Sequence, residues 1–188
     1  MTLPHLQTDR LILRLAEPAD IPALLRFHTE NMAHLAPTSP ATPPDYLTTD
    51  YWAREVARNH DDAAHERSIR LRLFLHSAPH AVIGSFTLSA IARGPAQFAN
   101  VGFALDHAHE GQGLMTEAGH AVIGYAFGEL NLHRLNACYL PSNVRSARLL
   151  QRLGFVVEGH ARDYLRIQGR WQDHVLVGLV NSAWQPGR

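Results

Sequence analysis

The sequence contains no lysine, so all 17 of its basic side chains are arginines. Its one cysteine, Cys138, cannot form a disulfide within the chain. Small secreted proteins usually depend on several disulfides, so a lone thiol favours a reducing compartment. The lack of lysine also excludes the Gly-x-x-x-x-Gly-Lys loop of P-loop nucleotide-binding proteins. The Gly-x-Gly-x-x-Gly spacing of dinucleotide-binding folds is absent too, which disfavours hydride-transfer enzymes.

Long uninterrupted hydrophobic runs are also missing. The longest stretch without a charged side chain, residues 73–92, is broken by His76, Pro79 and Gly84, which disfavours a membrane-spanning helix. The first 15 residues contain Pro4 and Asp9 where a signal peptide needs an apolar segment. We therefore predict a cytoplasmic protein that does not associate with a membrane.

Charge is balanced overall but is unevenly distributed along the chain. The 17 arginines match 17 acidic residues and the predicted pI is about 7.3, so we expect no direct binding to nucleic acid. Residues 1–66 nevertheless carry a net charge of −5, and residues 134–170 carry +5. The basic part would suit an anionic cofactor and the acidic part a cationic substrate, although solvated faces without a function explain the split equally well.

The length of 188 residues and a hydrophobic content of 46% predict a single domain, residues 1–188, with a substantial core. Hydrophobic periodicity and turn residues predict a mixture of helices and strands. The expected strands are 11–14, 68–75, 81–88, 100–105, 133–139, 156–161, 164–167 and 174–180, and the expected helices are 19–35, 44–60, 116–130 and 142–153. Strand–helix–strand units concentrate after residue 100, so the predicted class is α/β (α+β) with a central mixed sheet flanked by helices.

The most informative segment follows the strand that ends at Leu105. It reads Glu110-Gly-Gln-Gly-Leu-Met-Thr116 and leads directly into a helix. Closely spaced glycines before a helix leave several backbone N–H groups free at the positive end of the helix dipole, where a phosphate can bind. An ordinary strand–helix turn is the alternative, because two glycines alone are a weak signal.

Histidines beside this turn raise the question of a metal site. His107 and His109 flank the turn together with Glu110, but the His-Glu-x-x-His spacing is absent and no cysteine lies nearby. Chance pairs are common in a chain with 13 histidines. We therefore predict no metal ligands here.

A second polar segment lies between a strand and a helix, with Asn143 and Ser146 one helical turn apart. Together, Gly-Gln-Gly-Leu-Met-Thr-Glu-Ala and Asn-x-x-Ser followed by Leu153-Gly-Phe155 resemble the acyl-CoA-binding motifs of the GNAT superfamily of N-acetyltransferases. The segments from His133 to Val175, with Asp163-Tyr-Leu165 and Gly169-Arg-Trp171 among them, are similar to RimJ-type ribosomal-protein-alanine N-acetyltransferases in particular. Residues 36–66 match no motif.

This resemblance implies a single GNAT-type domain with a splayed sheet, which transfers acetyl from acetyl-CoA to a primary amine. The acceptor in that group is the N-terminal alanine of a ribosomal protein. A residue-by-residue match assigns cofactor contacts to Phe103, Ala104, Leu105, Glu110, Gly111, Gln112, Gly113, Leu114, Met115, Thr116 and Asn143. Arg145 and Arg148 are candidates for the ribose phosphate of the cofactor, with a solvated helix face as the equal alternative.

The chain departs from the superfamily pattern in three places. Glu110 and Met115 stand where a Gln or Arg and a small residue are usual, and Leu150 stands where many members carry a tyrosine that reprotonates the leaving thiolate. We assign that donor role to Ser146, with Asn143 orienting the pantetheine or the helix turn; helix capping is the alternative for both. Asp163 is the candidate base, and His160, Tyr164 and Glu110 are alternatives.

Aromatic residues Tyr139, Tyr164 and Trp171 are candidates for the peptide site, although single aromatics are more often core residues. Cys138 as an acyl-carrying nucleophile is disfavoured against a buried, inert thiol. Two other functions stay open: acetylation of a small amine such as an antibiotic, a polyamine or an amino acid, and acetyl-CoA binding or ribosome assembly without catalysis. Monomer and homodimer are both compatible with the sequence.

Overall fold

The computed structural model describes residues 3–186. Its strands are β1 (His5–Gln7), β2 (Leu11–Arg14), β3 (Ile69–Leu75), β4 (Gly84–Ala92), β5 (Phe98–Leu105), β6 (Arg134–Tyr139), β7 (Val156–Ile167) and β8 (Arg170–Val180). Its helices are α1 (Ile21–Leu35), α2 (Thr49–Ala64), α3 (Leu114–Gly128) and α4 (Val144–Arg152), with short 3₁₀ turns η1 (Pro18–Asp20), η2 (Ala36–Thr38) and η3 (His107–His109). This confirms the predicted mixed fold class.

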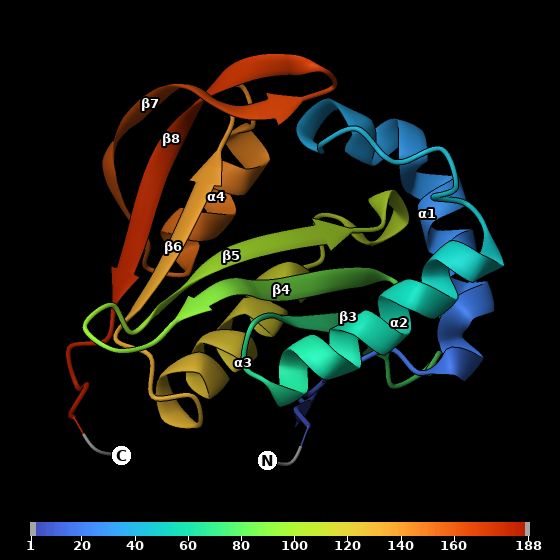
Figure 1. The fold of residues 1–188 in the computed structure, drawn as a ribbon, viewed down its shortest axis with the longest axis horizontal. Helices are drawn as coiled ribbons and strands as arrows, with labels where there is room; N and C mark the ends of the chain where they lie inside the picture. Colours follow the sequence, from blue (N-terminus) through green and yellow to red (C-terminus); the bar gives the residue numbers. More distant parts are fainter. Residues whose placement is uncertain (1–2, 187–188) are drawn as a thin grey trace.

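One sheet contains all eight strands, in the order β1-β2-β3-β4-β5-β6-β8-β7 (Figure 1). Every neighbouring pair is antiparallel except β5 and β6. These two parallel strands pair only from Phe98 to Asn100, opposite Arg134 to Asn136, and then diverge. The sheet is therefore splayed, as predicted, and the end of β5 keeps a partner only on its β4 side.

Helices cover both faces of the sheet. The larger core cluster contains residues of α3 and α4 packed on one face, among them Val122 and Leu149. The smaller cluster lies on the opposite face, where Phe27 of α1 and Trp52 of α2 pack against Phe74 of β3. Among residues 3–186, no helix combines the length and hydrophobicity needed to cross a membrane.

The boundaries of several elements differ from the sequence prediction. Helix α2 begins at Thr49 rather than near Pro44, because the Thr48 side chain accepts a hydrogen bond from the Tyr51 N–H and caps the helix there. Two predicted strands are one continuous strand, β7, whose register with β8 shifts between Ala161 and Leu165. Strand β1 was not predicted. Gly154, which follows α4, has a left-handed conformation with φ of 87°, as glycines that end helices commonly do.

Candidate active site

A cavity of about 830 Å³ opens where β5 and β6 diverge. Its walls come from the end of α1 and η2, the end of β5, the glycine turn with the start of α3, and α4. The residues that line it are His34, Leu35, Thr38, Phe103, Ala104, Leu105, Glu110, Gly111, Gly113, Leu114, Met115, Thr116, Asn143, Arg145, Ser146, Arg148, Leu149 and Arg152. The two segments singled out in the sequence thus form one cavity, although more than twenty residues separate them in the chain.

The glycine turn presents its backbone to this cavity. Gly111 and Gly113 both have left-handed conformations, with φ of 75° and 77°, which side chains rarely adopt. Among the described residues, the first backbone N–H of α3 that donates within the helix is that of Thr116, which bonds to the Gly113 carbonyl at 3.1 Å. The N–H groups before it stay available to an anion at the positive end of α3.

The turn is held in place by the N-terminal segment of the chain. Arg10 donates from Nη1 to the carbonyl of Gln112 at 3.0 Å and from Nε to Glu117 at 2.7 Å. The hydroxyl of Thr8 donates to the same Glu117 carboxylate at 2.6 Å. Burial raises the pKa of Glu117, but these hydrogen bonds outweigh it and hold the pKa below its usual value. The Thr-Asp-Arg opening therefore fastens β2 to α3.

Arginines surround the mouth of the cavity on the α4 side. Arg145, Arg148 and Arg152 line it and supply positive charge for phosphate groups. Glu110 opposes them with a negative charge, but its carboxylate is already paired with Arg145 and with His34 Nε2, which lies 3.1 Å from Oε1. The acidic substitution in the superfamily pattern is therefore compensated locally.

Asn143 and Ser146 take different roles at the start of α4. The Asn143 side chain accepts the Ser146 N–H at 3.1 Å and caps the helix. The Ser146 hydroxyl lines the cavity and makes no hydrogen bond with any described residue, so it is free to donate to a ligand. Leu150, at the usual tyrosine position, is only 1% exposed within the core and cannot take that role.

The structure does not bring every candidate residue into the cavity. Asp163 lies on β7, exposed, with its N–H bonded to the Asp173 carboxylate at 2.9 Å. Gln112 contributes its carbonyl to Arg10 and turns its side-chain amide to the Ala108 carbonyl instead. Tyr139 packs at the border of the larger core cluster.

Tyr164 and Trp171 are exposed on the arm formed by β7 and β8, outside the cavity walls. The tip of this arm reaches the segment after η2, where Gln168 Nε2 donates to the Ser39 carbonyl at 3.2 Å. Figure 1 shows the arm leaning toward the end of α1. The two aromatics therefore lie on an element whose tip contacts the segment after η2, but they do not line the cavity.

Several cavity residues were missed from the sequence. His34, Leu35 and Thr38 come from the end of α1 and from η2, a region without a recognisable motif, and Leu149 and Arg152 lie one and two turns into α4. In α4, Leu149 lies three residues after Ser146 and Arg152 three residues after Leu149, so each is the i+3 neighbour of the residue before it, and this signal was available. Nothing local indicated His34, because its place depends on how α1 packs.

Comparison with known proteins identifies the family. The family described as "Acetyltransferase (GNAT) domain" matches residues 10–156. The chain belongs to the GNAT acetyltransferase family. It is 35% identical over 184 residues to the Escherichia coli (strain K12) "[Ribosomal protein uS5]-alanine N-acetyltransferase", an alignment that covers 98% of this chain and 94% of that protein.

Solved structures support the same GNAT fold. A ribosomal-protein-S5-alanine acetyltransferase from Vibrio fischeri superposes with a TM-score of 0.92 at 32% identity, covering 97% of this chain and 100% of that one. Mycobacterium smegmatis RimJ in complex with CoA-disulfide gives a TM-score of 0.85 at 26% identity, covering 94% and 84%. As a GNAT N-acetyltransferase, the protein uses acetyl-CoA as its acetyl donor, and the resemblance noted in the sequence is confirmed.

Proposed function

We propose that this GNAT enzyme acetylates the α-amine of an N-terminal alanine on a ribosomal protein of the uS5 type. The observation that carries the proposal is the nearly end-to-end similarity to proteins named for that reaction, at 35% identity in sequence and a TM-score of 0.92 in structure. Because the similarity extends beyond the cofactor motifs into the β7–β8 arm, it includes a region that can contact the acceptor.

The cavity fits acetyl-CoA, which supplies an acetyl thioester when bound. The free N–H groups of Gly111 to Met115 and the positive end of α3 would hold its pyrophosphate, with Thr116 adding a hydroxyl. The side chains of Arg145 and Arg148 would neutralise phosphate charge from the α4 side. The end of β5, from Phe103 to Leu105, lacks a β6 partner and would pair with the pantetheine amides.

The same walls supply the groups that acyl transfer needs. The unengaged hydroxyl of Ser146 would donate a hydrogen bond to the leaving thiolate, and Asn143 positions Ser146 through its backbone. Of the four candidate bases only Glu110 lines the cavity, and its carboxylate is already paired. We therefore assign removal of the amine proton to water rather than to Asp163.

The acceptor would enter beneath the β7–β8 arm, beside Tyr164 and Trp171, while Tyr139 would line the route at the end of β6. Attraction of a basic peptide by the acidic residues 1–66 has less support. Asp45 pairs with Arg54, and Asp61 and Asp62 both pair with Arg67 just beyond the segment, so these three carboxylates are already neutralised by neighbouring arginines. Peptide selection would then rest on contacts near the α-amine.

The experiment that tests this function is isothermal titration with acetyl-CoA, followed by thiol release after adding peptides that begin with Ala, Ser or Met. We expect micromolar binding, on the order of −8 kcal/mol, and turnover with the Ala peptide. Turnover with polyamines or amino acids but not with peptides would show that the acceptor is a small amine rather than a peptide N-terminus. Cofactor binding without any thiol release would indicate that the protein binds acetyl-CoA but does not catalyse acetyl transfer.

A further inference from the structure

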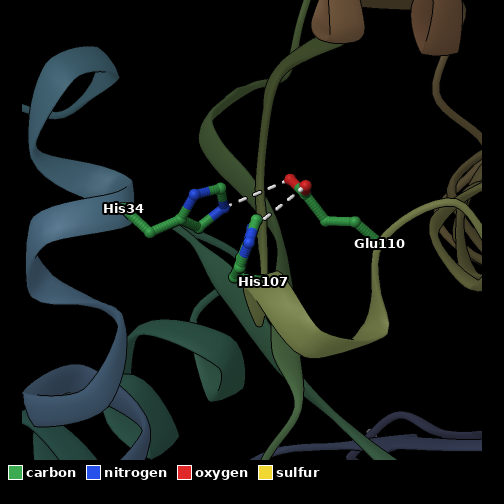
Figure 2. A group of neighbouring side chains, drawn as sticks. All are labelled: His34, His107 and Glu110. Atoms are coloured by element: carbon green, nitrogen blue, oxygen red, sulfur yellow. Dashed lines mark ion pairs between the residues drawn. The ribbon is translucent and has the colours of Figure 1, made fainter.

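Three side chains beside the glycine turn meet around one point (Figure 2). His34 comes from α1, His107 from η3, and Glu110 from the turn itself. One nitrogen of each histidine and one oxygen of the glutamate all lie within 4.8 Å of one another. His34 Nε2 is 3.1 Å from Glu110 Oε1, and His107 Nδ1 is 3.4 Å from Glu110 Oε2.

These distances match the spacing of ligands around a small divalent metal ion. Tetrahedral zinc with bonds of about 2.0–2.2 Å places neighbouring ligand atoms about 3.3–3.6 Å apart. Both histidine–glutamate distances fall close to that range, although they end on different oxygens of Glu110. The three ligand atoms lie within 4.8 Å of one another, so side-chain rotations would bring both imidazoles and one carboxylate around a single ion. Two imidazoles and one carboxylate are also a donor set that zinc uses in proteins, with a fourth position left for water or another ligand.

The accessibility of the three groups suits binding from solution. The side chains of His34 and Glu110 are 26% and 23% exposed, whereas His107 is 69% exposed. His34 and Glu110 are thus held in a partly buried setting, and the exposed side chain of His107 can rotate to complete the coordination of the ion. His109, the neighbour considered in the sequence, is engaged elsewhere, because its Nδ1 lies 2.8 Å from Asp106 Oδ2.

One cation already contacts the carboxylate. Arg145 pairs with Glu110 Oε2, but the Arg145 side chain is 72% exposed and makes no other hydrogen bond with the described residues. It can therefore swing away without loss of core packing. Without a metal, Arg145 pairs with Glu110, and the two imidazoles lie beside the same carboxylate.

We propose that His34, His107 and Glu110 bind one divalent transition-metal ion of the zinc class. Imidazole and carboxylate ligands suit Zn²⁺ and Co²⁺, and the absence of thiolates disfavours Cu(I). The ion would tie α1 to the glycine turn. It would also add positive charge at the border of the cavity, since His34 and Glu110 both line that cavity.

The test uses the full chain, stripped with EDTA and dialysed, without acetyl-CoA, so it is independent of the proposed enzymatic function. Zn²⁺ is titrated calorimetrically, and Co²⁺ is added separately to record the visible absorption of a tetrahedral site. We expect one equivalent of metal per chain. His107→Ala removes an exposed ligand outside the cavity walls and should weaken Zn²⁺ binding at least about 10-fold.

His120→Ala is the matched control, because His120 is exposed on α3, away from the three ligands. It should bind Zn²⁺ like the parent chain. Glu110→Gln keeps the side-chain shape and should abolish the cobalt spectrum. Failure of the parent chain to bind one equivalent, or equal affinities of His107→Ala and His120→Ala, would overturn the proposal. Circular dichroism and acetyl-CoA binding in EDTA would show that His107→Ala is folded.

Discussion

Arg10 and Glu117 are 107 positions apart in the chain and form a charged pair that fastens β2 to the start of α3. Arg10 Nε donates to Glu117 Oε2 at 2.7 Å, and the backbone N–H of Arg10 donates to Oε1 at 2.9 Å. Arg10 also holds the carbonyl of Gln112 within the glycine turn. Arg10 therefore connects β2 to both the glycine turn and the start of α3.

Replacing Glu117 by Gln should loosen this attachment. We expect the free energy of unfolding to fall by about 1 kcal/mol, because the hydrogen bonds from Arg10 lose their charged acceptor. Acetyl-CoA binding should weaken as well, since the turn is less rigidly held. Chemical denaturation and calorimetric titration measure both effects.

Glu129→Gln provides the control for this variant, because Glu129 is exposed at the far end of α3 and forms no ion pair within residues 3–186. Equal effects of the two substitutions would contradict the role assigned to Glu117. The lowered pKa of Glu117 adds a pH signature. Its stabilising contribution is present above its usual value of 4.5 and is lost as pH falls below it.

The left-handed glycine at the start of α3 makes a second prediction. Gly113→Ala forces a side chain into a φ of 77°, at a cost of about 1–2 kcal/mol, and distorts the turn. Acetyl-CoA should bind about 10-fold more weakly, equivalent to about 1.4 kcal/mol. Gly124→Ala lies on the same helix, where an added Cβ meets open space, and should stabilise the chain by about 0.5–1 kcal/mol. Unchanged cofactor affinity in Gly113→Ala would argue against phosphate binding by the turn.

The roles of Ser146 and Asn143 can be distinguished by measuring the stability and the kcat of their alanine variants. Ser146→Ala removes a hydroxyl that has no hydrogen-bond partner among the described residues, so Tm should not change while kcat falls about 100-fold. Asn143→Ala removes the helix cap and should lower stability by about 1 kcal/mol. Ser142→Ala, on the exposed turn before α4, is the control for the loss of a hydroxyl. A kcat for Ser146→Ala equal to that of the parent would remove it as the donor.

His28 makes stability depend on pH. Its ring stacks on Trp52 at 4.4 Å between centroids, and its Nδ1 lies 2.8 Å from the Tyr46 hydroxyl. Burial, with smaller contributions from the positive charges of Arg72 and Arg70, lowers the pKa of His28 to about 3. The unfolded chain binds a proton near pH 6.5 and the folded chain does not, so stability is complete above pH 6.5 and is lost as pH falls toward 3.

Between pH 6.5 and 3, we expect His28 to make the free energy of unfolding change by up to about 1.4 kcal/mol per pH unit. His28→Gln should remove this part of the slope in denaturation curves recorded at several pH values, whereas His120→Gln should keep it, because His120 is exposed. A His28 NMR resonance that titrates near pH 6.5 in the folded protein would refute the prediction.

The prediction from sequence succeeded where the deciding interactions are local. The glycine turn stands between a strand and a helix as predicted, and Asn143 caps the helix that follows it, which was the alternative to its assigned role. Both features follow from residues within about one turn of each other. The prediction missed the start of α2 and the continuity of β7. Several polar residues before α2 could act as its N-cap, so the sequence did not single out Thr48. The residues near Asp163 look like the end of a strand in the sequence, and only their pairing with β8 shows that β7 continues through them.

The sequence by itself therefore determined the family through its motifs, and the α/β class and the position of the glycine turn through hydrophobic periodicity and local backbone conformation. The tertiary structure decided which side chains share a space. Packing of α1 on the sheet brings His34 to Glu110 and His107, while the position of β7 keeps Asp163 outside the cavity. Contacts between distant segments depend on burial of the whole core, and no local pattern around His34 or Asp163 encodes them.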